Sequence, residues 1–114
     1  MSVEVHACPA IVAGYEYRVQ IEAEGQLFPV GCDLVSQIRT KTSATDIVTT
    51  LSTGNGGLVR LSDTILELVI PGPATAALPA GSVIADVVRT DLDPNRHLQF
   101  TLEIPVLRPI TRGL

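Results

Sequence analysis

The chain has 114 residues, of which 46% are hydrophobic, 18% charged and 4% aromatic, and its formal net charge is −4. This length suits one domain with one core, and the composition excludes general disorder. The negative charge and the scattered positive residues argue against a primary role in nucleic-acid binding. No stretch approaches the roughly 20 apolar residues that span a bilayer. We therefore expect a soluble domain with an aliphatic core and with neither nucleic-acid nor membrane partners.

The first residues do not have the pattern of a secretion signal. Glu4 stands where a signal peptide carries basic residues, and the apolar run 7–13 is short and contains Pro9. We expect synthesis and retention in a reducing cytoplasm. There Cys8 and Cys32 are expected to be buried thiols that act as small apolar side chains. A disulfide between them is the alternative for an oxidising compartment, and their pairing stays open.

Alternation of apolar and polar residues dominates the rest of the chain and predicts strands with one buried face. The clearest case is residues 98–106, where every second residue is a large apolar one. Tyr15 and Tyr17 share the apolar phase of the first strand, and Ile47 shares the phase of Leu51 in the third. The expected strands are residues 15–23, 33–40, 47–51, 59–61, 64–70, 82–90 and 98–106.

The segments between these strands carry turn signals. Gly54-Asn55-Gly56-Gly57 predicts a hairpin turn, because a phosphate-binding loop would continue into Gly-Lys-Ser/Thr and a helix. Pro71-Gly72-Pro73 ends the preceding strand, and residues 74–78 have room for one helical turn. Turn signals every 8–12 residues or so are typical of a β-sandwich. We predict an all-β sandwich of about seven antiparallel strands, with a closed barrel as the alternative.

Two patterns suggest metal ligation and then fail. Residues 91–95 read D-x-D-x-N, like the start of a calcium loop, but such a loop needs Gly at its sixth position and Glu at its twelfth. Arg96 and Leu102 hold those places, so a polar hairpin turn is expected. The histidines, His6 and His97, have no other ligands at a suitable spacing. We predict no metal site.

The sequence also lacks recognisable catalytic machinery. No G-x-S-x-G motif is present, and the strand carboxylates lie on the polar phase, where solvated charges are ordinary. We predict a protein that is not an enzyme and uses no cofactor, with no catalytic or cofactor-binding residue. The carboxylates concerned are Glu16, Glu22, Glu67 and Glu103.

The C-terminal half carries a recognisable order of segments. Two segments of the N-terminal half belong to the same pattern, Cys32-Asp33-Leu34 and Gln37-Ile38-Arg39. The main segments are Gly57-Leu58-Val59-Arg60-Leu61, residues 65–70, residues 74–81, residues 82–88 and Pro109-Ile110-Thr111-Arg112. This order resembles small tailed-phage and prophage structural proteins with an immunoglobulin-like domain, and is similar to the N-terminal domain of phage baseplate upper proteins. The likeness covers most of residues 15–112. It departs from the pattern at Ala85, where an aromatic residue is usual, and after Asp91, where a Gly is expected.

The resemblance implies an immunoglobulin-like sandwich and a non-enzymatic structural or assembly protein of a phage or prophage virion. Such a protein would be a tail, baseplate or neck component that contacts other virion subunits, with a homo-oligomer possible. It would occupy the bacterial cytoplasm during assembly and then the virion. Which virion part it forms is left open by the sequence.

We divide the chain into an N-terminal arm, residues 1–14, and a single sandwich domain, residues 15–112. The apolar part of the arm could dock on another copy, or it could lie on its own sheet or fray. The competing function is a soluble binding module for carbohydrate or a host surface. Sugar-binding faces usually present aromatic rings, and this chain has two Tyr, two Phe and no Trp.

Overall fold

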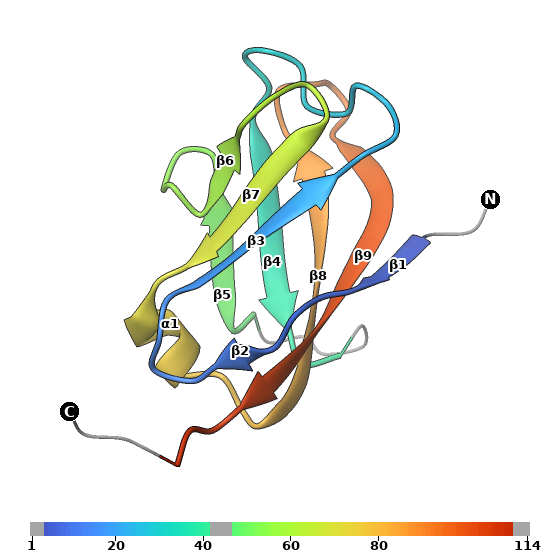
Figure 1. Cartoon of the computed structure of the whole chain (residues 1–114). Coiled ribbons are helices and arrows are strands. Elements are labelled where there is room, and N and C mark those ends of the chain that lie inside the picture. Colours follow the sequence, from blue (N-terminus) through green and yellow to red (C-terminus); the bar gives the residue numbers. More distant parts are fainter. Residues whose placement is uncertain (1–3, 42–46, 111–114) are drawn as a thin grey trace.

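The computed structural model describes residues 4–41 and 47–110, and in this part of the chain nine strands and one short helix form a two-layer sandwich (Figure 1). The all-β sandwich predicted from the alternation is confirmed at this level. The elements are β1 (Glu4–Ala7), β2 (Ile11–Val12), β3 (Tyr17–Glu22), β4 (Leu34–Arg39), β5 (Thr49–Ser52), β6 (Leu58–Arg60), β7 (Ile65–Ile70), α1 (Gly72–Ala76), β8 (Gly81–Arg89) and β9 (Arg96–Leu107).

The two layers differ in size. The larger sheet has the order β1-β9-β8-β4-β5, with β2 also paired to β9, and the smaller sheet has the order β3-β7-β6. In Figure 1 the smaller sheet lies in front of the larger one. Both sheets end in edge strands, so the architecture is an open sandwich and not the barrel considered as the alternative.

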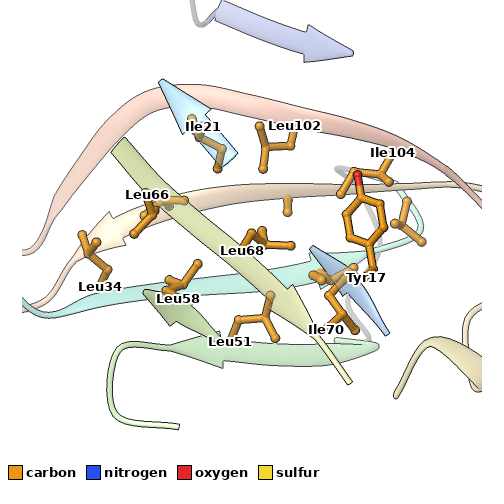
Figure 2. Packing of buried hydrophobic residues seen from close by; sticks show 14 of the residues in the cluster. Tyr17, Ile21, Leu34, Leu51, Leu58, Leu66, Leu68, Ile70, Leu102 and Ile104 are labelled. Atoms are coloured by element: carbon orange, nitrogen blue, oxygen red, sulfur yellow. The ribbon is translucent and has the colours of Figure 1, made fainter. Parts of the chain in front are cut away.

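The core lies between the sheets and follows the predicted alternation. In β9 the five apolar residues on the inward phase are all buried, and the same holds for Leu66, Leu68 and Ile70 in β7. Figure 2 shows side chains of both sheets meeting in the space between them. Burying one such Leu or Ile side chain contributes roughly 1.5–3 kcal/mol. The buried residues of β9 are Leu98, Phe100, Leu102, Ile104 and Val106.

Two predicted details are wrong at the strand ends. In β6 the buried residue is Leu58, whereas Leu61 lies outside the strand and is exposed. The register explains this, because Val59 faces Glu67 on the outward side of β7. Ile47 lies outside β5 and is also exposed, so the strand keeps only Leu51 in the core.

The glycine-rich segment 54–57 is not the hairpin turn that the sequence predicts. It joins β5 of the larger sheet to β6 of the smaller one, so it crosses between layers. The Asn55 carboxamide organises the crossing, because its Oδ1 accepts hydrogen bonds from the backbone N–H groups of Ser52 and Gly57, each at 2.9 Å. A Cβ on Gly57 would lie 2.7 Å from Cβ of Leu51, so only glycine fits there.

The N-terminal segment is packed on its own sheet. Strands β1 and β2 pair with β9 in parallel, with Ala7 opposite Glu103 and Ile11 opposite Val106. Ile11 is fully buried. The described part of the chain therefore has nine strands and not about seven, and two of their pairings are parallel. Strands of four and two residues around a proline are too short to show an alternation.

Helix α1 anchors the turn that follows β2. It covers residues 72–76, slightly earlier than the predicted 74–78, and Thr75 is fully buried. The Thr75 hydroxyl accepts a hydrogen bond from the Gly14 N–H at 3.0 Å, and its proton reaches the carbonyl of Tyr15 at 2.8 Å or that of Gly72 at 2.9 Å. We call this arrangement the Thr75 clamp. It fixes the backbone of residues 14–15 beside the end of β9.

Candidate interaction surfaces

An apolar hollow of about 620 Å³ lies at the end of the sandwich where β2 and the last residues of β9 lie. Eight large hydrophobic residues are exposed in the described chain, and four of them line this hollow. The remaining four are Val30, Ile47, Leu61 and Leu92, none of which lines it. The hollow therefore gathers exposed apolar surface at one corner. Its four exposed apolar residues are Val12, Tyr15, Leu107 and Ile110.

Parallel pairing builds the floor of the hollow. The partners Ile11 and Val106 point into the core, so the next pair along, Val12 and Leu107, points outward. The N–H of Ala13 donates to the Leu107 carbonyl at 2.9 Å and extends the pairing by one residue. Two apolar side chains from opposite ends of the sequence are thereby placed side by side on the surface.

Tyr15 forms a wall of the hollow, and its position corrects the sequence prediction. It was expected on the inward face of the first strand, but it precedes β3 and is 47% exposed. The chain turns at Gly14, which has a φ of +93°, and the Thr75 clamp holds the turn. Tyr17, two residues later, is buried, and its hydroxyl donates to the Pro9 carbonyl at 2.7 Å.

Two charges of opposite sign line the hollow, Glu16 and Arg108. Glu16 accepts a hydrogen bond from Arg18 Nε at 3.0 Å, and Arg18 also reaches Glu67 at 2.9 Å. These carboxylates, Glu16 foremost, raise the pKa of Arg18. Arg108 forms no ion pair with any described side chain. The hollow therefore has an anchored anion, Glu16, and a cation, Arg108, that has no ion-pair partner among the described side chains.

The sheet edges form a second kind of surface. Strands β1 and β5 bound the larger sheet, and β3 and β6 bound the smaller one. Along β3 the exposed side chains are polar or charged, namely Arg18, Gln20 and Glu22. Charged side chains on an edge oppose pairing with another sheet. The β3 edge is therefore less suited to strand pairing with another molecule.

A polar site lies on the outer face of the larger sheet. Nε2 of His97 is 2.9 Å from Oδ2 of Asp86, and Nδ1 of His97 accepts the N–H of Gln99 at 2.8 Å. The proton of the neutral ring is therefore on Nε2, which donates to Asp86. Gln99 has a φ of +64° and sits in a bulge, where the register steps from Asp86–Thr101 to Val88–His97.

This pair has the composition of a catalytic dyad but not its geometry. A general base needs a ring nitrogen that can accept a proton from a nucleophile, and both nitrogens of His97 are already engaged. A small hollow of about 200 Å³ adjoins Asp86 and is lined by Gln37, Arg39 and Thr101 among others. The arrangement accounts for the bulge in β9, because His97 holds the Gln99 backbone in place.

The calcium-like segment is a hairpin turn between β8 and β9, as predicted. Its first carboxylate is already engaged, because Asp91 Oδ2 accepts from Arg89 at 2.6 Å and its Oδ1 accepts from the Asp33 N–H at 3.2 Å. The Arg89 hydrogen bond is the main cause that lowers the pKa of Asp91 to about 2. Through these two hydrogen bonds, Asp91 connects this turn to the residue that precedes β4.

The other sequence candidates lie apart. Within residues 4–41 and 47–110, no three His, Cys, Asp or Glu side chains gather in a group that could hold a metal ion. The side chain of His6 is outside the described part. Cys8 and Cys32 form no disulfide, and burial raises the pKa of both thiols. Neither thiol is therefore primed for nucleophilic chemistry.

Sequence reasoning named none of the residues of the hollow as a site. One signal was available, namely pairs of adjacent apolar residues at strand ends, Ile11-Val12 and Val106-Leu107. In a strand with one buried face, the second member of such a pair points outward. That signal shows exposed apolar side chains, but it does not show that they meet.

The sequence matches no protein-family model, and a search of the curated proteins finds no match. Within the described residues, none of the helical structure is long and apolar enough to cross a membrane.

Proposed function

We propose that the chain is a non-enzymatic structural module of a phage or prophage virion that acts through protein–protein contacts. The observation that carries this proposal is the apolar hollow, where half of the exposed large hydrophobic residues meet. A contiguous apolar surface with a charged rim is typical of a protein contact site, whereas scattered apolar residues need no explanation. The engaged nitrogens of His97 are consistent with a role without catalysis.

We further propose that the sandwich is immunoglobulin-like. In that fold one sheet contains strands B, E and D, and the other contains C, F and G, often with a C′ strand next to C. The order β3-β7-β6 corresponds to B, E and D, and β5-β4-β8-β9 corresponds to C′, C, F and G. This correspondence supports the assignment. The Trp and inter-sheet disulfide of antibody domains have no counterpart here.

The virion assignment draws on the resemblance over residues 15–112. The matching segments lie in β6, β7, the region of α1 and β8, which are elements that form the sandwich. The partners would be other virion subunits at the tail, baseplate or neck. The protein would be present in the bacterial cytoplasm during assembly and in the finished particle.

The competing carbohydrate-binding function receives less support. Sugar-binding sites typically stack rings on exposed aromatic side chains, and of the four aromatic residues only Tyr15 is exposed. Tyr17, Phe28 and Phe100 are buried in the core.

Particle incorporation tests the proposal. Particles released from the host after prophage induction are purified and analysed by quantitative mass spectrometry, with L107D introduced into the hollow. The matched control is L61D, because Leu61 is 46% exposed and lies outside the hollow, while Leu107 is 55% exposed. We expect stoichiometric wild-type chain and L61D in particles, and depletion of L107D. Absence of the wild-type chain, or equal incorporation of both variants, would contradict the proposal.

A further inference from the structure

We propose that the apolar hollow is the contact surface of a symmetric homodimer, so that its occupant is the same hollow on a second copy of this chain. The inference rests on the proposed function, because it names the partner for a surface that we assign to protein–protein contacts. It goes further by specifying both the symmetry and the residues that face each other.

The apolar centre of the hollow can pack against a second copy of itself. A two-fold contact is isologous, which means that one patch must be complementary to itself. Apolar side chains satisfy this condition without directional demands. Here Val12, Tyr15 and Leu107 surround the hollow, and Ile110, at 97% exposed, projects beside them. Ile110 therefore has the exposure needed to contact the hollow of a partner.

The two charges that line the hollow, Glu16 and Arg108, can pair between two copies. Glu16 follows the turn after β2, and Arg108 follows the end of β9, so they come from separate parts of the lining. A two-fold axis that passes midway between these two residues brings Glu16 of each copy towards Arg108 of the other. Each dimer then gains two ion pairs, and a cation without a described partner within its own chain acquires one. A patch with one charge of each sign favours its own copy over a partner of a single sign.

The backbone around the hollow is held in place before any partner arrives. The Thr75 clamp fixes residues 14–15, and the hydrogen bond from Ala13 to Leu107 joins the floor to β9. The Tyr17 hydroxyl donates a hydrogen bond to the Pro9 carbonyl at 2.7 Å, just before β2 in the chain. Preorganised surfaces lose less conformational entropy on association.

Charge reversal tests the symmetry directly. The full chain is studied by sedimentation velocity over a concentration series, with R108E and E16R each measured alone and then mixed in equal amounts. Each variant alone places two like-charge pairs in its homodimer, so we expect its dimer dissociation constant to rise by at least about tenfold. In the mixture, a heterodimer of R108E with E16R regains both opposite-charge pairs, and dimers should reappear.

Matched controls exclude general effects of charge. R96E and E22R carry the same changes at exposed residues outside the hollow, and both should dimerise like the wild type. L107D should be monomeric throughout. Far-UV circular dichroism and thermal unfolding establish that every variant keeps the fold.

The outcomes separate this inference from the proposed function. Dimers that are lost in the single variants and restored in the mixture support the inference. A wild-type chain that stays monomeric overturns it, as do dimers that survive L107D or a mixture that restores nothing. In those cases the proposed function still stands or falls on the presence of the wild-type chain in purified particles, which is measured without reference to self-association in solution.

Discussion

The middle of β9 and its last residues behave differently, although they belong to one continuous stretch of chain. From Leu98 to Val106 every second side chain is buried against the smaller sheet, and the residues between are exposed or half-buried. At Leu107 the outward position carries a large apolar side chain, and Val12 lies beside it on β2. Strict alternation therefore marks a segment devoted to the internal core. Its interruption marks the place where apolar side chains are left exposed on the surface.

The largest expected effect comes from removing a core side chain from the alternating segment. We expect L102A to lower the free energy of unfolding by about 2–5 kcal/mol, because Leu102 is fully buried and its loss leaves a cavity. L107A removes the same atoms from an exposed position and should cost about 0.5 kcal/mol or less. Urea unfolding of both variants measures the difference. Equal losses would mean that the hollow is part of the core.

The next largest effect is expected at the Thr75 clamp, which holds the backbone beside the hollow. T75V keeps the shape of the side chain but leaves the Gly14 N–H and the Tyr15 carbonyl without this partner. We expect a loss of about 1–3 kcal/mol in unfolding free energy. Hydrogen exchange should show faster exchange at Gly14. T50V, at an exposed position of β5, is the control, and an equal loss there would argue against the clamp.

The crossing between the sheets should respond to a single methyl group. G57A forces a Cβ against Leu51, and we expect a loss of about 1–2 kcal/mol. The added methyl group of G25A meets no atom within 4 Å, so this variant should be close to neutral. Thermal unfolding compares the two. A neutral G57A would show that the crossing can adapt and that the glycine is not required.

The smallest effect concerns Asp91 and depends on pH. Its pKa is lowered in the folded protein to about 2 from 3.8, so folding favours the ionised carboxylate. The stabilisation is therefore fully present above pH 3.8 and is lost as the pH falls towards 2. We expect D91N to be less stable than the wild type at pH 7, with a gap that narrows as the pH falls to 2. Urea titrations at the two pH values measure this gap, and a gap independent of pH would contradict the prediction.

Most antiparallel strands could be predicted from the sequence, because each of them alternates apolar and polar residues within its own segment. Five predicted strands overlap β3, β4, β7, β8 and β9, and apart from Tyr15 their apolar phase faces inward as expected. The residues of a strand do not by themselves show which other strand it pairs with. The glycine-rich segment 54–57 looked like a hairpin turn, since nothing within it tells that β5 and β6 belong to different sheets.

The candidate site could not be predicted for a related reason. Val12 and Leu107 are far apart in the sequence and become neighbours only through parallel pairing of a two-residue strand. No periodicity can be read from two residues. The outward position of Tyr15 depends on the buried hydroxyl of Thr75, which is a contact between distant residues. Long-range pairing therefore creates the hollow, whereas local alternation creates the core.

The parallel pairing of β1 and β2 with β9 has a mechanical consequence. Glu4 and Leu107 lie at opposite ends of this ladder, as Figure 1 shows for β1 and the end of β9. Tension applied at these two residues would pull the paired strands past each other, so that their hydrogen bonds resist in shear and must yield together. A sandwich connected in this way would transmit force along this ladder before it begins to unravel.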